Sequence, residues 1–460
     1  MDGIARRARL ARSRLQLVLE ARPGGSDPEA LLDAALRGGV DVVQLREKEL
    51  PDDEIVRSAG PFRRACDAHG ALFVLNDRPG LVERCGADGV HVGRGDMPLL
   101  DARRTVGPDR LVGLSASTPD ELVGDADYFG VGAVHPTPTK PDADAGGLAL
   151  VRAARDALRV PWFAIGGIEL ETVDDVAAAG AAGVAVVRAI RDAEDPEAAA
   201  RALRAALPPT DAVVAEGDKE IRLPQLDWLE WSLAPDALGA RPHTHAAHTD
   251  VFHALAGEIE LRLGDETVRL PAGSTAAAPP LLVHGFRNPG SGEARYVNIH
   301  ATGGWASGRR RLPPGENDTF GVERASPRVR GIVTGPGDGD RIRSEHRLAL
   351  VKVEEDDLHV LEYGVGAGYE GASSHVHLLH ADCFHVLEGE LDLRAGGTHI
   401  RALPGSTVVV PPGVVHEFTS VGPARFLNVH APGCGFTDYL RALDAGGGVD
   451  ATRYDSYARP

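Results

Sequence analysis

Two threonines and a lysine stand close together in the segment GVGAVHPTPTKPDADAGG, residues 130–147. Thr137 and Thr139 alternate with prolines, and Lys140 directly follows the second threonine. Because proline restricts φ, we expect an extended loop whose hydroxyls and ammonium group point to one side. Such a group suits a phosphorylated ligand. The alternative is an ordinary surface loop, since alternating proline and threonine residues are common in loops.

A second group of chemically capable residues is a pattern of histidines and aspartates that occurs twice. The sequence HTHAAHTDVFHALAGEIELRL begins at His243, and HVHLLHADCFHVLEGELDLRA begins about 132 residues later at His375. In a strand, an H-x-H motif places both imidazoles on one face. An aspartate five residues further on and a distant histidine then complete a site of three nitrogens and one oxygen.

The pattern predicts two metal sites, one in each copy. Imidazole with carboxylate suits iron, manganese, nickel, copper or zinc, and the sequence does not choose among them. The alternative is a set of polar sandwich residues that bind no metal. The predicted ligands are His243, His245, Asp250 and His284 in the first copy, and His375, His377, Asp382 and His416 in the second.

The composition limits the class of protein. The 460 residues suffice for two or three domains, and a net charge of −18 argues against nucleic acid or an anionic membrane as the main partner. The four cysteines show no C-x-x-C spacing, which favours a reducing cytoplasm. No apolar run is long enough to span a membrane. We therefore expect a cytoplasmic protein that acts on small molecules.

Short apolar runs alternate with amphipathic helical segments from residue 15 to about 207. Eight such strand–helix units predict a (β/α)8 TIM barrel. The alternative, a doubly wound open sheet, lacks its Gly-rich fingerprint after the first strand. The runs are LQLVL (15–19), VDVVQL (40–45), ALFVLN (71–76), DGVHV (88–92), LVGLS (111–115), DYFGVG (127–132), PWFAIG (161–166) and GVAVV (183–187).

Polar residues follow these predicted strands at the end where barrel enzymes carry their chemistry. Neighbouring strands lie about 4.8 Å apart, so Asp77 and Asp96 are expected to reach one cation. Arg46, Lys48 and Lys140 are placed to surround a diphosphate that shares it. The alternative for each residue alone is a turn residue or a solvated charge. The rim residues are Gln44, Arg46, Lys48, Asn76, Asp77, Arg78, Asp96, Ser115, Thr137, Thr139, Lys140, Gly166 and Gly167.

Residues 15–207 resemble thiamine-phosphate synthase. The resemblance covers the whole predicted barrel and rests on VQLREK (43–48), LNDR (75–78), GVHVGRGDMPL (89–99), GLS (113–115), GVGAVHPTPTKPDA (130–143), AIGGI (164–168) and AGVAVV (182–187). The resemblance implies coupling of hydroxymethylpyrimidine diphosphate to a thiazole phosphate, with release of diphosphate. It also implies that Mg²⁺ is the cofactor.

The resemblance assigns a role to each matching residue. Gln44 would lie by the pyrimidine, and Asp77 with Asp96 would ligate magnesium. Arg188 stands where many relatives have serine, and Ser117 replaces a histidine of the related thiazole tautomerases, which counts against that activity. The diphosphate would be held by Arg46, Lys48, Asn76 and Lys140, with Ser115 nearby. The thiazole phosphate would be held by Thr137, Thr139, Gly167 and the backbone around Val187 and Arg188.

The second half of the chain resembles cupins. The motifs GSTAAAPPLLVH (273–284) and GSTVVVPPGVVH (405–416), then VNIHATG and LNVHAPG, extend both copies of the histidine pattern. The short β runs and Gly/Pro turns predict two all-β jelly-roll domains, residues 217–335 and 336–460. Residues 208–216, PPTDAVVAE, are expected to be the linker from the barrel domain, 1–207. Strand alternation points His253 and His385 away from the ligands, as packing or interface residues.

The favoured hypothesis is a magnesium-dependent transferase fused to a metal-binding bicupin of unknown role. The alternative makes the bicupin the working part, as a metal-dependent oxygenase, isomerase or small-molecule sensor beside a degenerate phosphate-binding barrel. Cupin fold alone implies no reaction. Barrels and cupins both commonly self-associate, so a homo-oligomer is weakly favoured.

Overall fold

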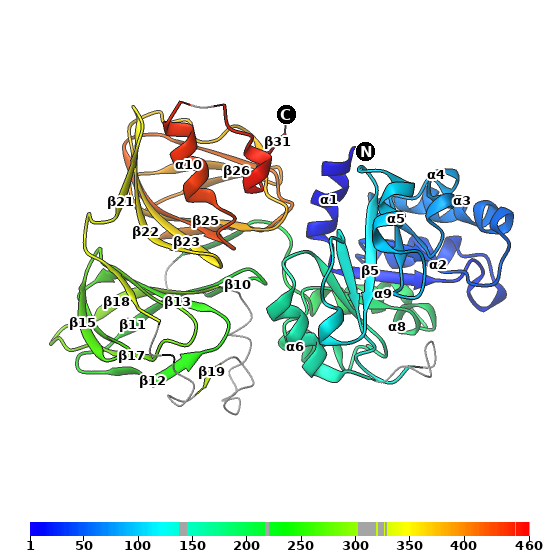
Figure 1. The fold of residues 1–460 in the computed structure, drawn as a ribbon, viewed down its shortest axis with the longest axis horizontal. Coiled ribbons are helices and arrows are strands. Elements are labelled where there is room, and N and C mark those ends of the chain that lie inside the picture. The colour runs from blue at the N-terminus through cyan, green and yellow to red at the C-terminus, as the bar shows by residue number, and fades with distance from the viewer. Residues whose placement is uncertain are drawn as a thin grey trace. The chain divides into compact units, whose positions relative to one another are not determined.

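The chain divides into two compact units, Met1–Thr210 and Asp211–Pro460. The computed structural model describes residues 1–137, 145–216, 220–301, 326, 329–446 and 448–459, together with the backbone of 319–320. Figure 1 traces both units from the blue amino terminus to the red carboxyl terminus.

The first unit is a closed barrel of eight parallel strands, as the sequence predicts. β1 pairs with both β2 and β8, which excludes an open sheet. The strands are apolar throughout because one face fills the barrel and the other packs against helices. Their bounds are β1 (Leu15–Leu19), β2 (Val42–Leu45), β3 (Leu72–Asn76), β4 (Gly89–Val92), β5 (Leu111–Ala116), β6 (Tyr128–Val131), β7 (Trp162–Ile165) and β8 (Val184–Val186).

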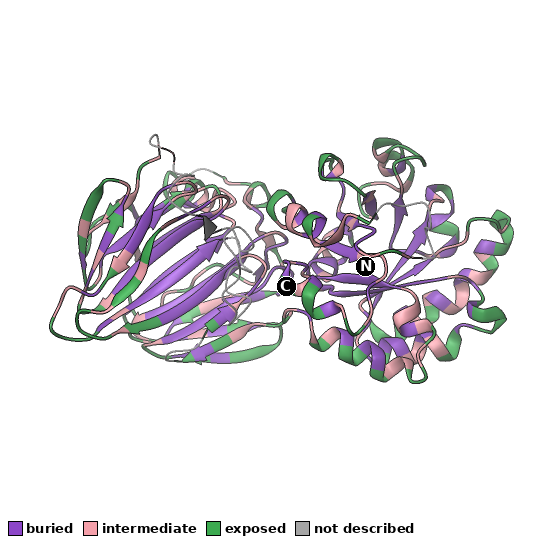
Figure 2. Ribbon diagram, turned by 90° about the horizontal axis from the view of Figure 1, so that it is seen from below, coloured by how far each residue is buried: buried purple, intermediate pink, exposed green. Residues whose placement is uncertain are grey.

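Helices cover the outside of this barrel, and in the ribbon of Figure 2 they carry green, exposed stretches, whereas the barrel strands are purple and buried. Within the described residues, no helix is both long and apolar enough to cross a membrane. The helices are α1 (Gly3–Arg12), α2 (Glu29–Arg37), α3 (Asp52–His69), α4 (Val82–Cys85), α5 (Leu99–Val106), α6 (Gly147–Ala157), α7 (Val173–Ala178), α8 (Arg188–Arg191) and α9 (Pro196–Ala205).

Helix α1 closes the amino-terminal end of the barrel. Its Leu10 is buried in one cluster with Val42 and Leu72, the first residues of β2 and β3. The basic side chains of the helix bind acidic ones at the strand starts, and Arg7 Nε lies 2.7 Å from Asp127 Oδ1. With this end closed, the carboxyl ends of the strands remain available for a binding site.

The second unit contains two sandwiches, each made of a larger and a smaller antiparallel sheet. In the first copy the strand orders are β10-β11-β18-β13-β16-β20 and β15-β14-β17-β12-β19. In the second copy they are β21-β22-β23-β30-β25-β28-β9 and β27-β26-β29-β24-β31. The prediction of two related all-β domains is confirmed by these matching orders.

The strands of the first copy are β10 (Glu220–Arg222), β11 (Asp227–Leu233), β12 (Leu238–His245), β13 (Thr249–Ala256), β14 (Glu258–Leu263), β15 (Glu266–Pro271), β16 (Thr275–Ala278), β17 (His284–Arg287), β18 (Ala294–Ala301), β19 (Thr319–Phe320) and β20 (Ile332–Thr334). Those of the second are β9 (Val213–Glu216), β21 (Asp340–Arg343), β22 (Arg347–Glu355), β23 (Leu358–Val365), β24 (His375–Val376), β25 (Ala381–Glu388), β26 (Leu391–Ala395), β27 (Thr398–Ala402), β28 (Ser406–Val410), β29 (His416–Ser420), β30 (Ala424–Ala431) and β31 (Tyr457–Ala458).

The expected linker, residues 208–216, is only partly a linker. Its second half forms β9, which pairs antiparallel with β28 of the second copy, with Ser406 opposite Glu216. The first copy has β20 at the matching edge, paired with β16. An unpaired sheet edge exposes backbone donors and acceptors. The short run VVAE pairs with this edge and becomes the new edge strand. The linker prediction missed this strand because it relied on proline and on the loss of the strand–helix alternation alone.

The two larger sheets pack face to face and share one core. Trp228 and Val251 of the first copy belong to the same buried cluster as Val360 of the second. His385 also faces this core, and its ring centroid lies 5.2 Å from that of Trp228. His253 is buried as well, with Nδ1 at 2.8 Å from Thr275 Oγ1. Both histidines therefore face away from the predicted ligands, as strand alternation predicts.

The end of the chain also forms regular structure. After α10 (Phe436–Asp444), a 3₁₀ turn at Ala451–Tyr454 leads into β31, which pairs with β24. Val376 lies opposite Tyr457 in this pair. The tail thus joins the sheet that carries one of the H-x-H motifs.

Candidate active site and metal centres

A pocket opens at the carboxyl ends of the barrel strands and gathers residues from every side of the rim. The sequence-predicted residues that line it are Gln44, Arg46, Lys48, Asn76, Asp77, Asp96, Ser115, Thr137, Gly166, Gly167, Val187 and Arg188. Thr139 and Lys140, also predicted, lie outside the described residues. The structure therefore brings together cations, carboxylates and hydroxyls that are far apart in the chain.

Two carboxylates meet on one side of this pocket. Asp77 has φ 59°, and its backbone N–H donates to His91 O at 2.9 Å. Asp96 Oδ2 accepts the Gly93 N–H at 2.8 Å. Burial, and then the facing carboxyl group of Asp96, raise the pKa of Asp77 above its usual value. Paired oxygens of this kind are what a hard divalent cation such as Mg²⁺ binds, so the residues fit that ion.

Lysine and arginine side chains supply positive charge around the same pocket. Lys48 Nζ lies 3.7 Å from Asp77 Oδ2, and the lysine side chain is 55% exposed. After β8, Arg188 Nη2 lies 3.4 Å from Glu169 Oε1. These exposed cations are free to turn toward an anionic ligand because weak surface pairing holds them only lightly.

Two glycines follow β7 and form part of the pocket wall without side chains. Gly166 and Gly167 have φ 106° and 61°, which other residues rarely adopt. A Cβ on Gly167 would lie 2.8 Å from both His135 Cβ and Pro136 O. Glycine is thus required here, and it lets backbone approach a bound group closely.

Sequence reasoning missed His91, which lies inside the pocket on β4. Its Nε2 lies 3.0 Å from Ser115 Oγ. The ring has space because the next two strands, β5 and β6, carry glycine at this level: a Cβ on Gly113 would lie 2.6 Å from His91 Nδ1, and one on Gly130 would lie 3.0 Å from Cε1. A histidine within an apolar strand, followed along the chain by two strands that each carry a glycine, was the available signal.

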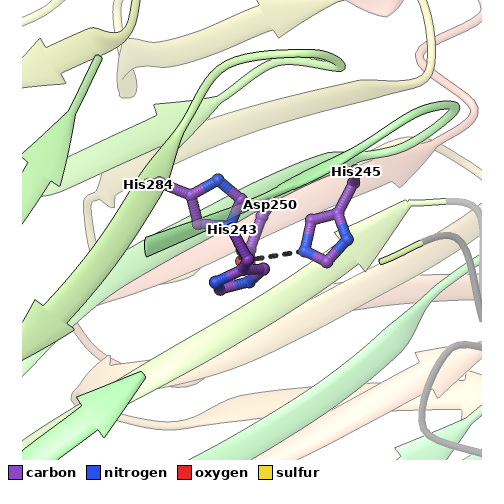
Figure 3. Close-up of side chains that lie close together, drawn as sticks. All are labelled: His243, His245, Asp250 and His284. Atoms are coloured by element: carbon purple, nitrogen blue, oxygen red, sulfur yellow. Dashed lines mark ion pairs between the residues drawn. The ribbon is translucent and has the colours of Figure 1, made fainter. Parts of the chain in front are cut away.

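The first predicted metal cluster assembles from three strands (Figure 3). The ligand atoms of His243, His245, Asp250 and His284 all lie within 4.8 Å of one another. His284 Nε2 lies 3.1 Å from Asp250 Oδ2, and His245 Nε2 lies 3.8 Å from the same oxygen. The four residues converge because β12 pairs with β17, with His243 directly opposite His284.

The second cluster has the same design. The ligand atoms of His375, His377, Asp382 and His416 also lie within 4.8 Å of one another. His375 Nε2 lies 3.2 Å from His377 Nε2, and His416 Nε2 lies 3.4 Å from Asp382 Oδ2. Burial and the neighbouring His416 lower the pKa of His375 to about 3. This ring is therefore neutral at physiological pH, as a metal ligand must be.

Backbone carbonyls orient the imidazoles in both copies. His243 Nδ1 lies 2.7 Å from Arg241 O, and His284 Nδ1 lies 3.0 Å from Leu282 O. In the second copy, His416 Nδ1 lies 3.0 Å from Val414 O. An Nδ1–H that donates to a carbonyl leaves the lone pair on Nε2, which faces the cluster. This arrangement of donors fits a divalent transition metal.

An N-x-H motif on β18 and β30 positions each aspartate, a role that sequence reasoning missed although it noted the repeated VNIH and LNVH. The Asn428 amide donates to Asp382 Oδ1 at 2.6 Å, and Asn298 donates to Asp250 in the same way. The other oxygen of each aspartate carboxylate, Oδ2, faces the histidine ligands. Burial alone would raise the pKa of Asp250, but facing imidazoles, first that of His300, hold it well below its usual range. The aspartate is thus held ionised.

Comparisons with known proteins also divide the chain into a barrel and two cupin domains. The family model "Thiamine monophosphate synthase" matches residues 15–190, and "Cupin domain" matches 229–300 and 360–430. A thiamine-phosphate synthase of Mycobacterium avium is 49% identical over 193 residues, which are 38% of this chain and 85% of that protein. One from Acidothermus cellulolyticus is 47% identical over 207 residues, 44% of this chain and 98% of that protein.

Solved structures resemble each half. A thiamine phosphate pyrophosphorylase from Pyrococcus furiosus is 30% identical with a TM-score of 0.40, over 43% of this chain and 96% of that one. A salicylate 1,2-dioxygenase mutant from Pseudoaminobacter salicylatoxidans is 14% identical with a TM-score of 0.36, over 47% of this chain and 74% of that one. The barrel and the pair of cupins define a two-part protein. From the sequence relatives, the chain belongs to the thiamine-phosphate synthase family.

Proposed function

We propose that the barrel pocket joins 4-amino-2-methyl-5-hydroxymethylpyrimidine diphosphate to a thiazole phosphate and releases diphosphate. The observation that carries this proposal is the pocket itself, in which Arg46 and Lys48 lie with the paired carboxylates Asp77 and Asp96. The chain is accordingly a transferase, and its product is thiamine phosphate.

The leaving diphosphate is the group that this pocket is suited to stabilise. Arg46, Lys48 and Asn76 would hold its oxygens, together with Lys140, which lies outside the described residues. Asp77 and Asp96 would hold Mg²⁺, which when bound neutralises charge on the diphosphate. Fixed cations aimed at a developing anion lower the barrier to its departure. Ser115 lies beside the reacting groups in this proposal.

The thiazole phosphate would lie across the pocket from the acidic pair. Thr137, Gly167 and the backbone of Val187 and Arg188 line that side, and Thr139 would join them. The aminopyrimidine, placed by Gln44, can carry positive charge once the diphosphate leaves. An anchored thiazole nitrogen then attacks in an effectively unimolecular step. No nucleophilic side chain of the protein is required.

We further infer that each cupin copy binds a divalent transition metal at its three histidines and one aspartate. This is supported by the donor sets, in which every residue but the half-buried His243 is buried, and by the carbonyls that orient the rings. A metal-dependent oxygenase, isomerase or sensor activity of the bicupin is the second candidate function, and these clusters are the observation that favours it. Both functions are compatible in one chain.

The net charge of −18 and the four free cysteines support small-molecule substrates and a cytoplasmic location. Both halves are of kinds that commonly self-associate, which supports a homo-oligomer. The domain limits we propose are 1–207, 217–335 and 336–460, with β9 from the segment before the first cupin completing a sheet of the second.

The first experiment supplies the purified full-length chain with both substrates and Mg²⁺ and measures thiamine phosphate. Product formation that stops on adding a chelator supports the magnesium-dependent synthase. A folded protein that forms no product would refute the barrel proposal.

Metal content provides the test of the bicupin. His377→Ala should lose one transition-metal ion per chain, whereas His346→Ala, an exposed histidine of the same copy, should lose none. Unchanged metal content in His377→Ala would contradict the second site.

A further inference from the structure

Three histidines of the second cupin copy form another group beside the predicted metal cluster. Ring nitrogens of His377, His380 and His430 lie within 4.8 Å of one another, and all three side chains are buried. Only His377 also belongs to the four-residue cluster. The other two come from the end of the H-x-H segment and from the N-x-H motif.

Hydrogen-bond partners fix which nitrogen of each ring carries its proton. His377 Nδ1 lies 2.8 Å from Asp455 O, and His380 Nδ1 lies 2.9 Å from Asp455 Oδ2. His430 Nε2 lies 2.9 Å from Asn428 Oδ1. Because all three partners are acceptors, each of these nitrogens is the donor. The remaining lone pairs are on His377 Nε2, His380 Nε2 and His430 Nδ1.

Two of these lone pairs have no partner in the described part of the chain. His380 Nε2 and His430 Nδ1 are both buried without a hydrogen bond, and their side chains are 0% and 1% exposed. A buried acceptor without a partner is costly, by about 1–3 kcal/mol in general. Three convergent acceptors are satisfied by a cation that accepts imidazole ligands.

The carboxyl-terminal segment builds this group. Besides binding two of the rings, Asp455 accepts the backbone N–H groups of Leu378 and Leu379 at 2.9 and 2.8 Å. Phe436 of α10 stacks on His430, with ring centroids 3.5 Å apart and an interplanar angle of 22°. The rings are therefore held in place before any ion binds, which is what a binding site requires.

We propose that the second cupin copy offers a divalent transition-metal ion a second position, formed by the imidazoles of His377, His380 and His430. His377 has one lone pair, so this three-imidazole position and the four-residue position are alternatives for one ion. The all-nitrogen position should suit Zn²⁺ or Cu²⁺ and disfavour Mn²⁺, which prefers oxygen ligands. The inference rests on the proposal that this copy binds metal at all.

The test loads the full-length chain with Zn²⁺, removes excess by dialysis and counts zinc per chain. Anomalous scattering from crystals locates each ion. His416→Ala removes a ligand of the four-residue position alone, and it should keep its zinc between the three imidazoles. The double variant His416→Ala/His380→Gln should lose that ion, so its zinc content should be lower than that of His416→Ala by about one zinc per chain. His416→Ala/His399→Gln is the matched control, because His399 is exposed, and should keep it.

The outcomes separate the two proposals. Wild-type protein that takes up no zinc in this copy would refute the four-residue site. If wild-type protein binds zinc but His416→Ala loses it as fully as the double variant does, only the second position is overturned. The same holds if the crystals of His416→Ala show solvent instead of zinc between the three imidazoles. Should His416→Ala not fold, the isosteric Asp382→Asn replaces it, with the same expectation.

Discussion

The barrel pocket and the cupin clusters place similar residue types in opposite surroundings. In the pocket, the Lys48 side chain is 55% exposed and that of Asp77 is 18% exposed. In the first cupin copy, the side chains of His284 and Asp250 are 1% and 4% exposed. An open site lets charged substrates enter and leave in each turnover, whereas a sealed cluster of donors retains an ion.

The two sites also differ in how they tolerate change. The pocket takes its residues from the ends of many strands, and its charged side chains come from several separate segments. The cupin clusters have a supporting layer of backbone carbonyls and asparagines that orients both aspartates and most of the histidines. We therefore expect large effects at the pocket from single charges, and graded effects at the cupins from the supporting layer.

The largest expected effect is on the coupling rate of Asp77→Asn, which should fall by about 10²- to 10³-fold, the usual scale for losing one key electrostatic group. Asparagine tolerates the positive φ of 59° at this position, so the fold should persist. Steady-state coupling assays measure the loss. Asp53→Asn, a highly exposed aspartate of α3, is the control and should retain full activity. Equal activity in both variants would remove Asp77 from the site.

A smaller effect is expected from the supporting layer of the cupins. Asn428→Ala frees Asp382 Oδ1, to which the amide donates at 2.6 Å, and should weaken metal binding by about 10- to 100-fold. Asn298→Ala tests the first copy in the same way, and coupling in the barrel should not change in either. Competition with a chromophoric chelator measures both affinities. Unaltered affinity would mean that the aspartates need no such support.

Separating the halves should have little effect on the barrel. Because the first unit is Met1–Thr210, a chain that ends at Thr210 should be soluble and should couple its substrates within about twofold of the full-length rate. Comparing the two rates under equal conditions checks this. An insoluble or inactive fragment would mean that the cupins contribute to the barrel, and the contrast between independent halves would not hold.

The smallest effect concerns the stability of the metal-free barrel. The pKa of Asp77 in the folded state is raised above its usual value, so above that raised pKa the ionised carboxylate costs folding free energy. Asp77→Asn should therefore raise Tm by a few degrees at pH 7 in chelator. The gain should fade as the pH falls through the raised pKa. Thermal melts at pH 7 and pH 4 compare the two proteins, and a lower Tm at pH 7 would contradict the prediction.

Local patterns predicted much of both halves. Apolar runs with helical spacers predict the eight barrel strands, and the spacing of two histidine motifs predicts both four-residue clusters. These succeed because strand periodicity and strand ends are local properties of the chain. β9 was missed because an edge strand depends on a partner almost 200 residues away, Val408 opposite Val214.

The reactive side chains at each strand end and in each H-x-H motif can be identified from the sequence, because side-chain type and strand alternation are local properties. The further groups that join them depend on tertiary contacts. His91 enters the pocket through space left by glycines on two other strands. Asp455 reaches the rings of His377 and His380 because the tail returns as β31. Such contacts join segments that are distant in the sequence, so local sequence patterns do not predict them.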